Sequence, residues 1–478
     1  MKQRRKSFAA AGNQAGSEAG NYKQGQLNAI LQADAAFMGK DYDKAYQLYD
    51  EAIVKNPDEA PYAMYQKALI AGLKSKPEEK IQLLQKVVKE YPKSRMATAA
   101  EYELGAAYLE HNQLTESKSI FEKLAKSDDK ELRFKALAKL AFVEQKTGNY
   151  DQAIAHYKRL VIEYPGHPER EATLESLRNA YIQKGDVAAY YAFAKENNIE
   201  SAGEENMDED YFVMAENKYI DEDYKGAVSA LDAYLSKFPN GANKVQAYYL
   251  KGESLLAQKE YDKAKVAYQE VIGSGDADYK SLADIKMAMV QYELKDYQAA
   301  ITAAQQYLEG TGDAEAQVPA HLILMKAHNK LNQKDQAVHS AAFLKPYEDR
   351  LTDQEKLEMK LIRAYALQQD RDYTAARKMY EEVAHAKTGA WSAEARYRMA
   401  QTLLLEGKLK EAEAACDQAI KENQSEHYWM VKSYILIGEI LGAQKDYFNA
   451  RATLQSVVNN ANNDELEQEA RKTAGYNR

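Results

Sequence analysis

Apolar residues recur every three to four positions along most of this chain, which is the spacing of one face of an α-helix. Residues 246–273 show the pattern clearly. Apolar or small side chains fall at Tyr249, Gly252 and Leu255, and a second set starts at Tyr261 after a polar turn. Sustained alternation of apolar and polar residues is absent. The sequence therefore predicts helices joined by short turns and essentially no sheet.

A short signature marks the start of the second helix in each pair. It reads acidic or amide residue, Tyr, two variable residues and Ala, as in Asp41 to Ala45 and Asp223 to Ala227. The signature or a weaker form of it recurs twelve times, at intervals of 35–39 residues. Its centres are Ala45, Lys80, Ser117, Ala153, Ala189, Ala227, Ala264, Ala300, Ala337, Ala376, Ala412 and Ala450. Such a period is typical of solenoids, in which each unit buries its apolar face against its neighbours. We therefore predict an all-α solenoid of about twelve helix-turn-helix repeats.

Small residues twelve positions apart, as in Gly252 with Ala264, and prolines that close several units, as in Pro92 and Pro165, carry a family resemblance. The pattern resembles the tetratricopeptide repeat, a helix-turn-helix unit of about 34 residues. The resemblance covers residues from about 23 to about 460, although the family's tryptophan at the fourth position is missing. It implies a right-handed superhelix with a concave groove. Residues 89–94 and 235–241 also resemble versions from bacterial envelope proteins, which implies a bacterial source.

Composition divides the predicted array. Residues 1–22 are a basic stretch of low hydrophobicity that we expect to be a disordered tail. Residues 197–210 hold six acidic residues and a glycine. We expect them to form an acidic loop or joint between repeats 1–5 in residues 23–196 and repeats 6–12 in residues 211–460. Residues 461–478 are expected to form a C-terminal helix or tail.

Charge and hydropathy limit the classes of partner that we expect for this chain. The chain has 64 basic and 73 acidic residues, a net charge of −9, with both signs interspersed, so we expect no nucleic acid partner. No stretch reaches the ~20 apolar residues that span a bilayer, so no membrane insertion is expected. The basic start lacks the apolar stretch of a signal peptide, which predicts a cytoplasmic chain. The alternative is the periplasm or cell envelope, if the N-terminus is truncated.

Motifs for chemistry are missing from the sequence. No phosphate-binding loop, zinc-binding histidine pair or cysteine pair occurs, so we expect no cofactor and no metal. The one cysteine, Cys416, falls in a slot that holds aromatic residues in other repeats, which predicts a buried apolar role. Acids four residues before bases, as in Glu394 with Arg398, are typical of solvated helix faces rather than of catalysis. We expect no catalytic residue and no enzyme.

The resemblance implies that the first helix of each repeat lines the groove. Tyrosine suits such a surface because its ring is apolar and its hydroxyl stays wet, but many of these rings would equally fill gaps between helices. The candidate protein-binding residues are Tyr62, Tyr65, Tyr102, Phe142, Phe212, Glu216, Tyr219, Tyr249, Glu253, Tyr292, Lys326, Tyr365 and Tyr397.

The resemblance and the missing motifs favour a non-catalytic scaffold that binds protein or peptide segments in the concave groove. Two alternatives stay open at this point. One is a structural component of a bacterial cell-envelope complex, and the other is a fragment of a larger regulatory protein of the same repeat family.

Overall fold

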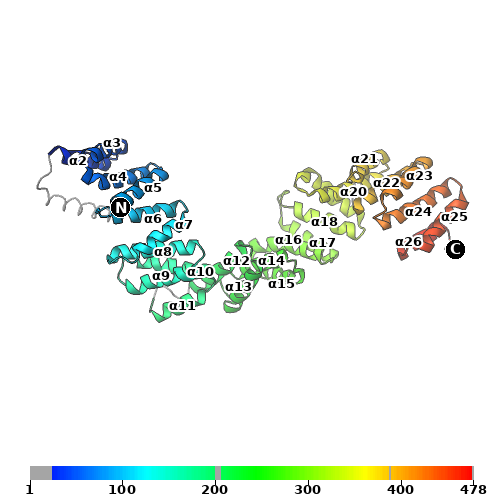
Figure 1. Cartoon of the computed structure of the whole chain (residues 1–478). Helices are drawn as coiled ribbons and strands as arrows, with labels where there is room; N and C mark the ends of the chain where they lie inside the picture. The colour runs from blue at the N-terminus through cyan, green and yellow to red at the C-terminus, as the bar shows by residue number, and fades with distance from the viewer. Residues whose placement is uncertain (1–23, 200–205, 387–388, 476–478) are drawn as a thin grey trace. The chain divides into compact units, whose positions relative to one another are not determined.

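The structure is a computed structural model that describes residues 24–199, 206–386 and 389–475. Within these ranges every regular element is helical and none is a strand (Figure 1). Helices α2 to α25 form twelve consecutive pairs, each with a first helix, a short turn and a second helix, and α26 follows the last pair. The predicted all-α array of about twelve helix-turn-helix repeats is confirmed.

The first helices carry even numbers. They are α2 Gln24–Met38, α4 Ala60–Leu73, α6 Ala97–Glu110, α8 Lys130–Lys146, α10 Arg170–Lys184, α12 Met207–Ile220, α14 Lys244–Ala257, α16 Ala277–Glu293, α18 Val318–Lys330, α20 Asp353–Gln369, α22 Ala390–Leu405 and α24 His427–Ala443. The second helices carry odd numbers. They are α3 Tyr42–Lys55, α5 Pro77–Glu90, α7 Leu114–Leu124, α9 Tyr150–Glu163, α11 Val187–Glu196, α13 Tyr224–Lys237, α15 Tyr261–Gly273, α17 Tyr297–Gly310, α19 Lys334–Leu344, α21 Tyr373–Ala384, α23 Leu409–Glu422 and α25 Tyr447–Asn460. The remaining elements are α26 Asp464–Thr473 and the short 3-10 helices η1 Pro57–Glu59 and η3 Lys345–Arg350.

The structure explains the sequence signature. Its acidic residue caps the second helix: Asp41 and Asp223 each accept a hydrogen bond from the backbone N–H three residues later, at 3.3 and 3.0 Å. Such a cap satisfies an amide that has no partner within the helix. The signature tyrosine packs on the first helix of its own pair, as Tyr224 does on Tyr219 with ring centroids 6.0 Å apart. The signature alanine, such as Ala227, is fully buried.

The two helices of a pair approach closely at small residues. A Cβ atom on Gly252 would lie 2.6 Å from the ring of Tyr268, so no larger residue fits there without a shift. Tyr268 lies four positions after the signature alanine and is fully buried. Cys416 fills the same slot in its repeat, is fully buried, and burial raises the pKa of its thiol to about 12. The predicted apolar role of this cysteine is confirmed.

The chain divides into two compact units, Met1–Met214 and Ala215–Arg478. The predicted tail lies outside the described residues, and so do residues 200–205 of the predicted acidic loop, while Met207 already begins α12. The predicted domain limits therefore stay predictions. At the end of the second unit, α26 buries Leu466 and Ala470 against α24 and α25.

Packing differs between the two kinds of helix. Consecutive first helices contact each other directly, as α14 does with α16 and α22 with α24. Within the described residues no two second helices are in comparable contact. We call the surface made by the first helices the first-helix face. Among the described helices, none combines the length and the apolar character that crossing a bilayer requires.

Candidate protein-binding surfaces

In the first unit, three of the predicted groove tyrosines fill space between helices. The hydroxyl of Tyr62 donates a hydrogen bond of 3.0 Å to Asp34. Tyr102 packs edge-on against the buried ring of Phe121, with centroids 5.6 Å apart. Tyr65 is half-buried against the core that α4, α5 and α6 share. These rings tie neighbouring helices together and leave little open surface.

The two predicted phenylalanines of this unit have opposite environments. Phe212 is 3% exposed and belongs to the core, so its ring is closed to a partner. Phe142 is 42% exposed on α8, and the ammonium of Lys146 lies 5.6 Å from its ring centroid. Phe142 is therefore the one open ring among the residues predicted for the first unit.

In the second unit, Glu253 on α14 organises a cluster of predicted and unpredicted residues. Its carboxylate accepts a hydrogen bond from the Tyr268 hydroxyl and another, of 2.6 Å, from the ammonium of Lys286 on α16. The ring of Tyr249 lies 5.6 Å from that of Tyr279 on α16. Burial, with the charge of Glu253 adding to it, raises the pKa of Tyr249 to about 12. Its hydroxyl is therefore a neutral group at physiological pH.

The neighbouring predicted residues on α12 also link helices. Glu216 accepts a hydrogen bond of 3.1 Å from Gln246 on α14, and Tyr219 supports the signature residue Tyr224. Burial raises the pKa of Tyr219 above its usual value. The structure thus brings Glu216, Glu253 and their tyrosines together along α12 and α14, where they join successive first helices.

One line of side chains on α16 is open where its neighbours are closed. Tyr279, Leu282, Lys286 and Met289 are spaced by three or four residues, so they lie on one stripe of the helix. Tyr279 and Lys286 reach α14, which orients this stripe towards the first-helix face. Leu282 is 47% and Met289 is 40% exposed. We call these four residues the α16 stripe.

The stripe was not predicted from the sequence. The residues predicted there are aromatic or charged, whereas the two open residues of the stripe are aliphatic. The signal that could have found them is positional: Met289 follows the small residue Ala288, just as Glu253 follows Gly252 in the preceding repeat.

The remaining predicted residues lie further along the second unit. Tyr292 packs on the signature residue Tyr297, with ring centroids 5.4 Å apart. The ammonium of Lys326 on α18 pairs with Glu355 on α20 at 2.7 Å. Both residues serve contacts within or between repeats.

Tyr365 and Tyr397 belong to an alternating stack of rings and cations. The guanidinium of Arg398 lies 5.4 Å from the Tyr365 centroid and 5.7 Å from that of Tyr397. On α24, the ammonium of Lys432 lies 5.5 Å from the ring centroid of Tyr397. The ring of Trp429, also on α24, packs beside Tyr397 with centroids 5.5 Å apart. Tyr397 is only 5% exposed. We call these five residues the ring–cation stack; it joins α20, α22 and α24.

Among the described residues, no group of three or more His, Cys, Asp or Glu side chains is placed to hold a metal ion. The buried thiol of Cys416 has a raised pKa, which disfavours the nucleophilic thiolate. The Glu394–Arg398 pair, expected on a solvated face, instead lies at 3.2 Å within the ring–cation stack, with both side chains 19% exposed.

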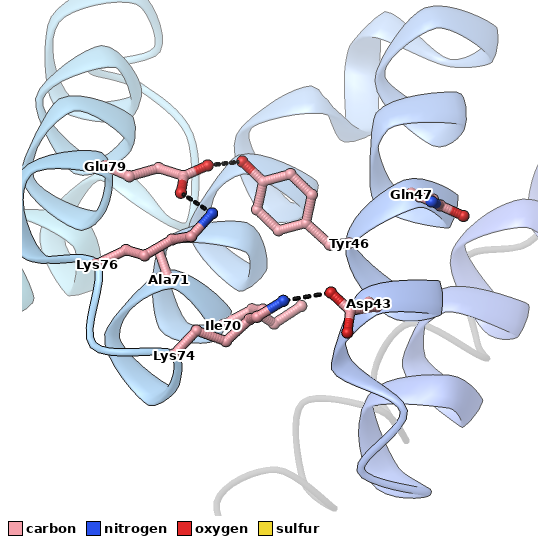
Figure 2. A pocket seen from close by; sticks show the side chains of 8 residues that line it. All are labelled: Asp43, Tyr46, Gln47, Ile70, Ala71, Lys74, Lys76 and Glu79. Carbon is pink, nitrogen blue, oxygen red and sulfur yellow. Dashed lines mark hydrogen bonds and ion pairs between the residues drawn. The ribbon is translucent and has the colours of Figure 1, made fainter.

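A separate small cavity lies between α3, α4 and α5 in the first unit (Figure 2). Its volume is about 140 Å³. The Tyr46 hydroxyl donates a hydrogen bond to Glu79, and the ammonium of Lys76 pairs with the same carboxylate at 3.2 Å. Lys74 pairs with Asp43 across the cavity. These contacts narrow the space to less than the roughly 300 Å³ of typical ligand pockets, and in this sense we call the cavity closed.

Comparison with known proteins gives matches to three family models, each described as a tetratricopeptide repeat. They cover residues 62–94 and 135–167, residues 214–279, and residues 367–435. No curated protein matches this chain in sequence.

Solved structures that match are distant in sequence. A chain in a structure of Naa15/Naa10 bound to HypK-THB is 13% identical, with a TM-score of 0.40, over 94% of this chain and 78% of that chain. MamA is 20% identical, with a TM-score of 0.31, over 36% of this chain and 88% of its own. A tetratricopeptide repeat protein from Parabacteroides merdae is 12% identical, with a TM-score of 0.29, over 55% of this chain and 99% of its own.

Proposed function

Because this chain belongs to the tetratricopeptide repeat family, we propose that it is a non-catalytic scaffold that binds a segment of a protein partner on its first-helix face. Stacked helical repeats present extended surfaces on which partner segments bind. We place the contact at the α16 stripe. The observation that carries this choice is that two exposed apolar side chains, Leu282 and Met289, lie on one stripe that also contacts the neighbouring first helix α14.

The stripe can both bind a partner segment and fix the position of that segment along the helix. Leu282 and Met289 are seven residues apart, which is about 10 Å along the helix axis. A partner segment that presents two apolar side chains at this separation would bury both residues, and burial of apolar surface drives association. The Glu253–Lys286 pair lies between the two residues along the stripe, so polar groups of the partner would be fixed beside it.

The test is site-specific photo-crosslinking in the cells that make the protein. Benzoylphenylalanine replaces Met289 in one variant and Thr302, an exposed residue on the second helix of the same repeat, in a control variant. We expect a protein adduct from the first position that is absent from the second. Adding Leu282→Ser to the first variant should lower the yield of the crosslinked adduct. Equal labelling from the two positions, or labelling that Leu282→Ser leaves unchanged, would remove the α16 stripe as the binding surface.

A further inference from the structure

A second open surface lies on the other side of the array, between the second helices α13 and α15. It is a trough of about 550 Å³ whose floor includes α14. Its apolar lining comes from Val228, Tyr248, Leu255 and Val266. Its charged lining is Lys225, Lys251 and Lys263 with the carboxylates of Asp232 and Glu260. Val266 is 59% exposed although it is apolar. This volume is within the range of sites that hold ligands or side chains of a partner, roughly 300–1,000 Å³.

The closed cavity of Figure 2 occupies the equivalent place between repeats 1 and 2. Counted from the signature centres, Tyr46 corresponds to Val228, Asp43 to Lys225 and Glu79 to Lys263. The frame of the two sites is the same. Lys67 on α4 pairs with Asp50 on α3, and the corresponding Lys251 on α14 pairs with Asp232 on α13 at 2.5 Å.

What differs is the set of groups that closes the space. Between repeats 1 and 2 the chain supplies its own aromatic ring, Tyr46, and its own carboxylates, Asp43 and Glu79. Between repeats 6 and 7 the ring is replaced by the smaller Val228, and both acids are replaced by lysines. The trough is open because the groups that would fill it are missing.

The charges of the open trough are only partly balanced. Lys263 pairs with Glu260 at 3.2 Å, with both side chains at least half exposed, so this ion pair is weak. Lys225 pairs with no carboxylate within the described residues. An aromatic side chain would cover the apolar floor, and carboxylates beside it would meet Lys225 and Lys263. These are the groups that Tyr46 and Glu79 provide in the closed site.

We propose that the trough between α13 and α15 binds an acidic peptide segment of a partner that carries an aromatic side chain. The ring lies against Val228, Leu255 and Val266, and the flanking carboxylates pair with Lys225 and Lys263. This site is separate from the α16 stripe, and neither proposal depends on the other.

The experiment measures the fluorescence anisotropy of a labelled peptide of glutamates and aspartates around one phenylalanine. A matched peptide carries the same phenylalanine among lysines. We expect the acidic peptide to bind the full chain and the basic peptide not to bind. The double variant V228Y/K263E rebuilds the closing groups of the first site, so binding should weaken at least about tenfold. Unchanged helical circular dichroism shows that this variant folds.

Two further variants make the result specific. Thr302→Ala, on the exposed surface of α17, should leave the peptide affinity unchanged. The reverse exchange Y46V/E79K opens the first cavity and should add a second binding event. Equal affinity of wild type and V228Y/K263E, or equal binding of the two peptides, overturns the proposal. So does self-association in the ultracentrifuge that V228Y/K263E abolishes, because a second copy of the chain would then be the occupant.

Discussion

The cavity between repeats 1 and 2 and the trough between repeats 6 and 7 have the same helical frame and opposite outcomes. In the first, Tyr46 spans from α3 to Glu79 on α5 and leaves about 140 Å³. In the second, Val228 is too short to cross from α13 to α15, and about 550 Å³ stays open. The same helical frame can therefore carry a small or a large space at the junction of two repeats, depending on the side chains that line it.

The largest effect should come from removing the ring that closes the first cavity. Tyr46→Ala loses apolar burial, the hydrogen bond to Glu79 and the contact with Lys67, whose ammonium lies 4.2 Å from the ring centroid. Because the ring is half-buried, we expect a loss of about 2 kcal/mol in the local unfolding free energy. Hydrogen exchange of the α3–α5 amides measures it. The matched control Val228→Ala should cost less than about 1 kcal/mol, and equal losses at the two sites would contradict the comparison.

The lysine shared by the two frames gives a smaller difference. Lys67 is 9% exposed and contacts the Tyr46 ring, whereas Lys251 is 25% exposed and has no such ring at the equivalent position. Replacing each with Met keeps the side-chain stem and removes the charge. We expect a cost of about 1 kcal/mol at position 67 and about half of that at position 251. The same exchange measurement on α3–α5 and on α13–α15 compares them, and the reverse order would show that the ring contact contributes nothing.

The smallest effect is a pH dependence of the first cavity that comes from Glu79. The hydrogen bond from Tyr46, and then the charge of Lys76, hold the pKa of Glu79 below its usual 4.5. A carboxyl with a lowered folded-state pKa stabilises the fold above its unfolded pKa, and this stability is lost as the pH falls through the folded value. In urea unfolding between about pH 7 and about pH 3, Glu79→Gln should therefore lose less stability on acidification than the wild type.

The matched variant for this series is Val228→Ala in the open trough. This variant changes no charged group, so it should lose as much stability on acidification as the wild type. Parallel curves for wild type and Glu79→Gln would mean that the carboxylate makes no net contribution to the closed cavity.

The fold could be predicted from the sequence because the signature records local physics. Asp41 and Asp223 cap the N-termini of second helices, and Gly252 permits the close approach of two helices. The role of each of these residues follows from its residue type. The open surfaces could not be predicted in this way. Exposure of a first-helix side chain depends on what the next repeat places beside it, some 35–39 residues later in the chain. Tyr397 was predicted to be a binding residue, yet Trp429 of the following repeat packs beside it.

The cavity between repeats 1 and 2 and the trough between repeats 6 and 7 show the same limit of reading a sequence one residue at a time. Val228 and Lys263 are unremarkable residues on helices when read one at a time. Their meaning comes from being adjacent across two repeats and from the contrast with Tyr46 and Glu79 at the equivalent positions. A sequence search that aligns repeats in pairs, and compares charges across each junction, would have found the open trough.

The place of Trp429 in the ring–cation stack has an optical consequence. The chain has only two tryptophans, Trp391 on α22 and Trp429 on α24, against 36 tyrosines. Emission excited at the red edge of the absorption band therefore reports on repeats 11 and 12 alone, while circular dichroism averages over every helix. If the array melts in steps, the two signals will give different midpoints in urea, and their difference locates the last hairpins in the order of unfolding.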